Sequence, residues 1–215
     1  MRRNEEELRT RITDAFQRVA ARFPAYRKQM RTANEVTIRE ILERYYSDDA
    51  INSLRDQLVI DIGRAFEGVK RDGGVTLHET QVLDDYGGEA ERIAARKLDF
   101  QERWQDLPDE LLEAGWPLVF LDSNGFRFHL PAYMIWRLRY PFVPELGSDY
   151  LCGMLVGCTS SELWNLGLFD AEQAKTIYRF LKFCVEVETE LPDFDADDLE
   201  FRESLEKWLA LSQGV

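Results

Sequence analysis

The chain has 215 residues, 45% of them hydrophobic and 31% charged, a composition that is typical of a globular protein and excludes a disordered one. Its 40 Asp and Glu residues outnumber 27 Lys and Arg residues, and the net charge of −13 argues against a general nucleic-acid binder, which must neutralise phosphates. Three cysteines without a C-x-x-C pair favour a reduced, cytoplasmic setting.

The first half of the chain shows helical periodicity. Apolar spacing predicts an amphipathic helix over 5–23, followed by helices over 34–48 and 48–74. The apolar positions of the first helix recur fifty residues later, which indicates either a degenerate repeat or the ordinary likeness of amphipathic helices. The matched positions are Leu8, Ile12, Ala15, Phe16 and Val19 against Leu58, Ile62, Ala65, Phe66 and Val69.

The middle of the chain carries clear helix boundaries. Thr76 and Glu79 have the spacing of a capping box, which predicts a helix start at that point. A charged amphipathic helix is expected over 89–104, and a short helix over 107–115 has Pro108 near its first turn.

The stretch DSNGFRFHLPAYMIWRLRYP at 122–141 is rich in aromatic rings and arginines. Residues 118–130 fit either a short β-hairpin or a helix capped at Asp122 or Ser123. A helix that starts near Pro131 has two apolar stripes, which indicates a central helix with Trp136 buried. A protein contact, or an anionic ligand or nucleobase held by the arginines, remains an alternative. The arginines are Arg127, Arg137 and Arg139.

The last third adds two helices. Asp170 is a suitable N-cap for a helix over 170–188, and a final helix over 195–213 has acids at its start. We therefore predict a mainly α, multi-helix globular fold. Its expected parts are an N-terminal helical extension (1–57), a main helical domain (58–191) and an acidic C-terminal helix (192–215), which together form one compact unit.

Several segments in this order resemble a bacterial family of unknown function. They are GVTLHETQVLDDYGGEAERIAARKLDFQERWQDLP, LVFLDSNGFRFHLPAYMIWRL and LGLFDAEQAKTIYRFLKF. The resemblance covers about residues 58–185 and includes an F-x-L-P-A-Y block from Phe128 to Tyr133. It implies a shared fold and brings no reaction, so no catalytic residue is implied by it.

Catalytic and cofactor motifs are absent from the sequence. It contains no HExxH, P-loop, GxGxxG or GxSxG pattern, so no cofactor is expected, and two histidines cannot form a histidine-rich metal site. The acids at 193–200 imitate a calcium loop but lack its glycine and final glutamate, so no metal site is expected there.

The best enzyme candidate lies on the helix after Thr76. His78 and Asp85 are seven positions apart, so they share a helix face, and with Asp84 they could orient a water or a ligand. His129 could join them through the fold. The alternative is a capping glutamate, an acid pair at a helix end and an exposed histidine.

Charge distribution suggests a different function. Residues 1–31 hold nine Arg and Lys against four acids, whereas residues 186–206 hold ten acids and one base. The two charged segments are either two solvated faces, or the acidic one is a docking surface for a basic partner. The first helix either packs on the acidic segment or pairs with a second copy as a homodimer. The candidate contact residues are Asp193, Asp195, Asp197 and Asp198.

The leading hypothesis is a cytoplasmic, protein-binding accessory or immunity-type module for a basic protein partner. The alternative is an enzyme or small-ligand binder that uses His78, Asp84 and Asp85. No signal peptide is expected, because the first ten residues lack an apolar run. No membrane span is expected either, because the apolar run at 150–158 is too short to cross a bilayer.

Overall fold

The computed structural model describes residues 45, 47–112, 114, 116–139, 148–160, 165–188 and 199–214. Within these ranges the chain is helical without strands, so the predicted mainly α class is confirmed. The helices are α4 (Asp49–Ala65), α5 (Leu77–Asp84), α6 (Glu89–Arg96), α7 (Asp109–Leu112), α8 (Ser123–Arg139), α9 (Ser148–Ser160), α10 (Ala171–Glu188) and α11 (Leu199–Ser212). Short 3-10 turns lie at η1 (Trp104–Asp106), η2 (Leu118–Phe120) and η4 (Leu166–Leu168). The expected helix over 5–23, and with it the proposed repeat, lies outside the described residues.

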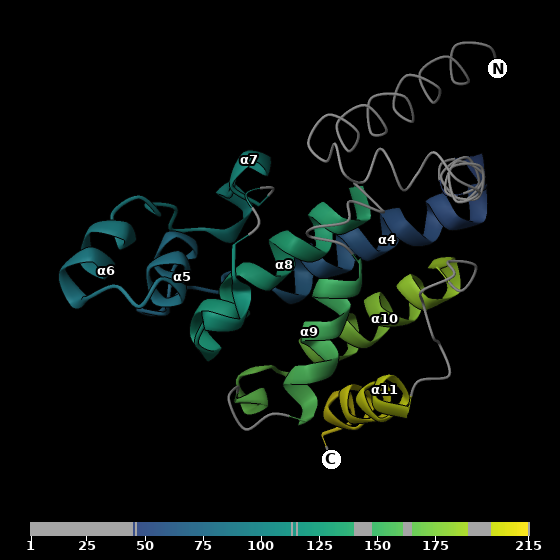
Figure 1. Ribbon diagram of the computed structural model, residues 1–215. Helices are drawn as coiled ribbons and strands as arrows, with labels where there is room; N and C mark the ends of the chain where they lie inside the picture. Colours follow the sequence, from purple (N-terminus) through teal and green to yellow (C-terminus); the bar gives the residue numbers. More distant parts are fainter. Residues whose placement is uncertain are drawn as a thin grey trace, which may run out of the picture.

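The helices divide into a body and a smaller end (Figure 1). In the body, α10 packs against α4 and α11, α11 packs against α9, and α8 contacts both α4 and α9. Helices α5 and α6 pack against each other at one end of the molecule, and η2 lies against α5. No helix of the described residues is both long and apolar enough to cross a membrane.

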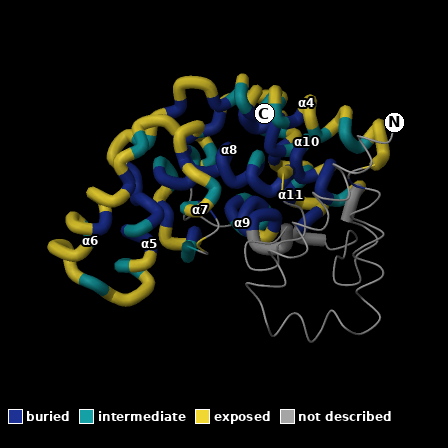
Figure 2. Tube along the Cα trace, turned by 90° about the horizontal axis from the view of Figure 1, so that it is seen from above, coloured by how far each residue is buried: buried dark blue, intermediate teal, exposed yellow. Residues whose placement is uncertain are grey.

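Helix α8 is the central helix, as its two apolar stripes predicted. Twelve of its 17 residues are buried, and Trp136 is 2% exposed, which confirms its predicted burial. Figure 2 shows buried residues running through the middle of the molecule, where α8 and α9 lie. An aromatic cluster extends this core, with the Phe169 ring edge-on to Phe66, Phe126 and Trp208.

Two expectations for residues 118–139 are corrected by the structure. The hairpin alternative at 118–130 is wrong, because η2 is followed directly by α8 from Ser123. The helix start near Pro131 is also wrong, since Pro131 lies inside α8. The cause lies at Asp122, whose Oδ1 accepts a 2.8 Å hydrogen bond from the backbone N–H of Gly125 and so caps the helix about two turns earlier. Burial of both faces then outweighs the backbone hydrogen bond that proline cannot make.

The first turn of α8 makes a close backbone crossing with the loop before α5. Asp122 Oδ1 also accepts a 3.0 Å hydrogen bond from the N–H of Val75, so one carboxylate both caps α8 and holds the loop. A Cβ atom on Gly74 would collide with the backbone of Gly125, and one on Gly125 would collide with the backbone of Val75. Neither glycine can therefore be replaced without separating the two segments.

Polar side chains fix the ends of the body helices. Asp170 Oδ1 accepts a 2.9 Å hydrogen bond from the N–H of Gln173, which confirms the predicted N-cap of α10. The Gln173 side chain is buried and donates to the carbonyl of Ala65 at 3.1 Å, and the Trp104 indole donates to the carbonyl of Phe66 at 2.8 Å. Both bonds satisfy carbonyls at the C-terminal end of α4, where the helix itself offers no partner.

Helix α6 is shorter than the sequence predicted. It ends at Arg96, and Trp104 lies in the separate turn η1, so a single helix over 89–104 is wrong. The chain leaves the helical path at Lys97–Asp99, where the Asp99 side chain is drawn inward and only 1% of that residue is exposed. The partners of this buried acid belong to the candidate site.

Candidate functional site

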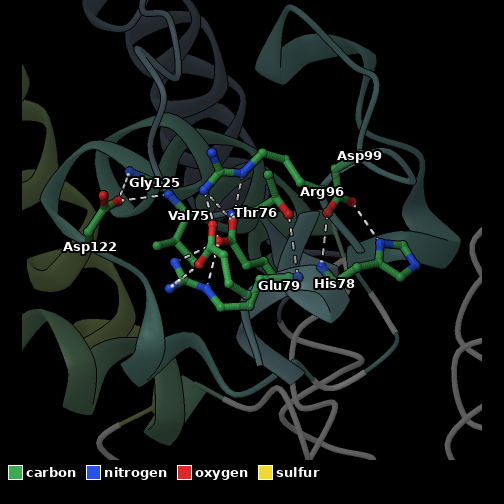
Figure 3. Close-up of polar contacts among 10 residues, drawn as sticks. Val75, Thr76, His78, Glu79, Arg96, Asp99, Asp122 and Gly125 are labelled. Carbon is green, nitrogen blue, oxygen red and sulfur yellow. Dashed lines mark hydrogen bonds and ion pairs between the residues drawn. The ribbon is translucent and has the colours of Figure 1, made fainter. Parts of the chain in front are cut away.

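The start of α5 is held by a buried glutamate between two arginines. Thr76 and Glu79 form the predicted capping box, with bonds of 3.4 Å from Glu79 N–H to Thr76 Oγ1 and 3.3 Å from Thr76 N–H to Glu79 Oε2. The same carboxylate accepts hydrogen bonds from Arg92 and Arg96 of α6, the shortest at 2.8 Å (Figure 3). Glu79 therefore closes the helix start and also fastens α6 to α5.

Burial and charge act in opposite directions on Glu79. Its side chain is 1% exposed, and burial alone would raise its pKa. Hydrogen bonds from Arg96 and Arg92 outweigh burial and hold the pKa of the carboxyl below its ordinary value. The glutamate is thus charged at neutral pH and fully engaged, which makes it a structural group and not a free acid for chemistry.

Next to Glu79, His78 pairs with Asp99. The ring Nδ1 lies 2.8 Å from Asp99 Oδ1, and the backbone N–H of His78 donates to Asp99 Oδ2 at 2.9 Å (Figure 3). The His78 ring also packs against Trp116 in a tilted arrangement, with 4.4 Å between the ring centroids. Because the carboxylate faces Nδ1, the neutral ring carries its proton there and leaves Nε2 as the basic nitrogen.

This pair has the arrangement that a general base requires. Asp99 is buried, and Arg71 donates a 3.0 Å hydrogen bond to its backbone carbonyl, so the acid is held in place. The His78 side chain is 28% exposed, so its ring can be reached from solvent. An oriented imidazole on a buried carboxylate can accept a proton or bind a ligand through Nε2.

The other residues of the predicted enzyme site lie elsewhere. Asp84 and Asp85 are exposed at the far end of α5, and Asp85 accepts a 3.1 Å hydrogen bond from Gln81. His129 is 1% exposed within α8, and its Nδ1 lies 2.6 Å from the carbonyl of Gly125. The structure therefore joins His78 to Asp99, a residue that the sequence analysis did not single out.

His129 is a neutral core histidine. Burial lowers its pKa to about 4, although the bond to the Gly125 carbonyl and the charge of Asp99 act in the opposite direction. Its Nε2 is buried without a hydrogen-bond partner in the described part of the chain. A ring with no exposed face cannot meet a substrate from solvent, so His129 cannot join His78 in a site at the surface.

The predicted acidic contact residues add no further geometry. Asp193, Asp195, Asp197 and Asp198 lie outside the described residues. Across the described ranges, no group of three or more His, Cys, Asp or Glu side chains is arranged to hold a metal ion.

A groove of about 630 Å³ lies between α4 and the start of α10. Its charged walls are largely paired internally: Asp61 binds Arg179 and lies 4.0 Å from Arg64, while Lys175 lies 3.8 Å from Glu172. Burial would raise the pKa of Asp61, but hydrogen bonds from Gln57 and Arg179 lower it. The Asp61–Arg179 pair connects α4 to α10, while the other pairs lie within one helix, so the charges of the groove are accounted for by helix packing.

Exposed apolar side chains gather at the α5–α6 end. Nine large apolar residues are exposed in the described part of the chain, and six of them lie between residues 86 and 120. This exposed apolar group consists of Tyr86, Ile93, Leu98, Phe100, Val119 and Phe120. Phe100 is 79% exposed, although the neighbouring Asp99 is buried.

The fold and the site define an all-α protein with a polar network at one end of an aromatic core. The chain belongs to a family of unknown function (DUF6714), whose model matches residues 54–210. This confirms the resemblance seen over 58–185 and extends it at both ends, so that α11 lies within the family region up to residue 210. No curated protein matches the chain. No solved structure matches it either.

Proposed function

We propose that this protein is a protein-binding accessory module, of the kind that masks a partner, and that its partner is a basic protein. The single observation that carries the proposal is the exposed apolar group at the α5–α6 end. Protein contact surfaces combine apolar side chains at their centre with polar groups at the rim. Isolated exposed apolar residues are ordinary, whereas six at one end of the molecule favour a partner that covers them.

The charge of the α5–α6 end indicates the sign of the partner's net charge. Residues 81–106 contain seven acidic and four basic residues, and two of those bases, Arg92 and Arg96, are bound to Glu79. Asp84 and Asp85 are exposed there and are assigned here to the contact rim. A net charge of −13 also favours rapid association with a positively charged protein. The acidic segment that contains Asp193, Asp195, Asp197 and Asp198 is proposed as a second attraction for the same partner.

The test uses two matched isoleucines. Ile93 at the α5–α6 end is 51% exposed, and Ile60 on α4 is 54% exposed. A partner is first captured from extracts of the native host and purified, and its affinity is then measured by calorimetry. Ile93→Ser and Phe100→Ser should each weaken binding at least about tenfold, as loss of a central apolar contact does. Ile60→Ser should bind like the unchanged protein.

Charge reversal supplies the second arm. Asp84→Lys together with Asp85→Lys should slow association with a basic partner, and the effect should shrink as salt is added. Asp56→Lys, at an exposed acid of α4, is the matched control. Equal binding by all these variants, or affinity that is independent of salt, would contradict the proposal.

A second candidate function is favoured by the His78–Asp99 pair, and it is an enzyme or small-ligand binder in which His78 is the base. Because the chain has two histidines, His129 serves as an internal control. The activated ester p-nitrophenyl acetate reports a reactive imidazole. His78→Gln should abolish the protein's excess hydrolysis over buffer, while His129→Gln should retain it. Equal rates for both variants and the unchanged protein would remove this candidate.

A further inference from the structure

Helix α5 ends in a turn where a glycine is usual and a tyrosine is found. The backbone N–H of Tyr86 donates to the carbonyl of Leu83 at 3.2 Å, and the N–H of Gly87 donates to the carbonyl of Val82 at 2.7 Å. These two bonds form a Schellman motif, in which the first residue after the C-cap takes a left-handed conformation. That residue is Tyr86, with a φ of 58°. A bulky side chain therefore occupies the position of the motif that favours glycine.

Folding does not explain a tyrosine at this position. A Cβ atom in the left-handed region lies too close to a carbonyl oxygen, so glycine, and less often Asn or Asp, adopts it routinely. Packing cannot offset this strain, because Tyr86 is 96% exposed. The glycine that follows has a separate purpose, since a Cβ atom on Gly87 would lie 2.5 Å from Val82 Cγ1. The ring thus destabilises the folded chain slightly and makes no compensating contact within it.

The surroundings of Tyr86 favour a positively charged group. Residues 84–91 contain four acids and no base, and all four acids are exposed. They are Asp84, Asp85, Glu89 and Glu91. The carbonyls at the C-terminal end of α5 add partial negative charge, and the face of a tyrosine ring itself attracts cations. The planar guanidinium of arginine can stack on such a ring, so arginine is the side chain that this turn fits best.

We propose that Tyr86 is the anchor residue of the contact surface and that its ring stacks on an arginine side chain of the basic partner. This inference rests on the proposed function and names its central contact. Tyrosine and arginine are both enriched among the residues that contribute most to protein interfaces. Strained backbone conformations concentrate at functional positions, where binding and not folding accounts for the residue.

The first arm of the experiment tests the strain and needs no partner. Tyr86→Gly relieves the left-handed conformation and should raise the melting temperature by about 2 °C, after allowance for the freedom that glycine adds to the unfolded chain. Tyr86→Ala retains a Cβ atom and should not raise it. Asp72→Gly is the matched control, because Asp72 has a φ of 51° and should gain less. An unchanged or lower melting temperature for Tyr86→Gly would overturn the proposal.

The second arm measures the cation contact with a defined probe, a fluorescein-labelled octa-arginine peptide, by fluorescence anisotropy at low salt. Tyr86→Ala should weaken binding about two- to fivefold, as loss of one exposed cation–π contact does. Tyr86→Phe keeps the ring and should bind like the unchanged protein. Ile60→Ala, at an exposed apolar residue of α4, is the control that should also bind normally.

Three outcomes of the second arm overturn the proposal. They are equal binding by Tyr86→Ala and the unchanged protein, no binding of the peptide to the unchanged protein, and equal weakening by Ile60→Ala. If Tyr86→Ala instead converts a dimer into a monomer in sedimentation velocity, a second copy of the chain covers the ring, which also contradicts the proposal.

Failure of this proposal is distinguishable from failure of the proposed function. If Ile93→Ser loses the native partner while Tyr86→Ala binds the peptide normally, the contact surface is supported and only the anchor is wrong. If Tyr86→Ala loses the peptide while Ile93→Ser and Phe100→Ser keep the native partner, the arginine contact is supported and the proposed function is wrong.

Discussion

The helical body and the α5–α6 end of the molecule are stabilised by different forces. The body is built on buried rings, with Trp136, Trp208 and Phe180 each 2% exposed or less. The α5–α6 end has few such side chains, and its two short helices are joined by the Glu79 carboxylate and two arginines. Apolar burial has little dependence on pH or salt, whereas ion pairs depend on both. The difference shows how a stable core can carry a smaller end whose attachment responds to solution conditions.

The largest expected effect is in the body. Trp136→Ala should lower the free energy of unfolding by about 3–5 kcal/mol, because it removes a buried ring and leaves a cavity. Urea denaturation measures the change. Trp136→Phe keeps a ring in place and should cost clearly less. A loss below about 1 kcal/mol for the alanine variant would mean that the ring is not a core residue.

A pH titration tests the neutral histidine beneath the polar network. His129 has a pKa of about 4 in the folded protein against an ordinary value of 6.5, so the unfolded chain binds a proton first as the pH falls. The contribution of neutral His129 to the free energy of unfolding is complete above pH 6.5. It is lost as the pH falls from 6.5 to about 4, by about 3 kcal/mol in total. Urea denaturation at a series of pH values should show the free energy of unfolding falling over this range, and His129→Gln should flatten that dependence. An unchanged slope in that variant would refute the assignment.

The attachment of α6 is tested at Glu79. Glu79→Gln leaves Arg92 and Arg96 without their carboxylate. Because both arginines are partly exposed, we expect the free energy of unfolding to fall by about 2 kcal/mol, less than for a fully buried pair. Hydrogen exchange should accelerate in α6 and remain unchanged in α10. Glu89→Gln is a matched control, since Glu89 contacts the same Arg92 but is 73% exposed. Similar losses for both variants would argue against the role of burial.

The smallest effect concerns the chain before the family region. Tyr45 is 2% exposed, its hydroxyl donates a 2.8 Å hydrogen bond to the carbonyl of Leu138, and its ring packs edge-on against Phe183. Tyr45→Phe should lower the free energy of unfolding, measured by urea denaturation, by about 1 kcal/mol. Tyr86→Phe, at a residue that is 96% exposed, should cost nothing measurable. A neutral Tyr45→Phe would weaken our expectation that the N-terminal extension and the main domain form one unit.

Features set by neighbouring residues could be predicted from the sequence in both the body and the α5–α6 end. Helical periodicity, the Thr76–Glu79 capping box and the Asp170 N-cap are local signals, and the structure bears them out. The pairing of His78 with Asp99 could not be predicted in this way, because 21 positions separate them and the pair forms only when the chain turns back after α6. Contacts made by tertiary packing leave no fixed spacing in the sequence.

Pro131 shows the limit of a local rule. Proline is common in the first turn of a helix, and that preference placed the start of α8 eight residues too late. The start was decided instead by Asp122, where a carboxylate serves two segments at once. Similarly, no helix was predicted for the glycine-containing run at 150–158, although it lies in α9. Burial against α8 and α11 compensates for the low helix propensity of its glycines.

The crossing of Gly74 and Gly125 has a mechanical consequence. The two backbones meet without a side chain between them, and Asp122 bonds to both segments. Side chains that rotate can absorb a displacement, but two main chains in direct contact cannot. A displacement of α5 or α6, for example by a bound partner, is therefore transmitted directly to the first turn of α8. That helix is the one around which the rest of the protein is packed. The α5–α6 end is therefore connected rigidly to the core at the point where Gly74 meets Gly125.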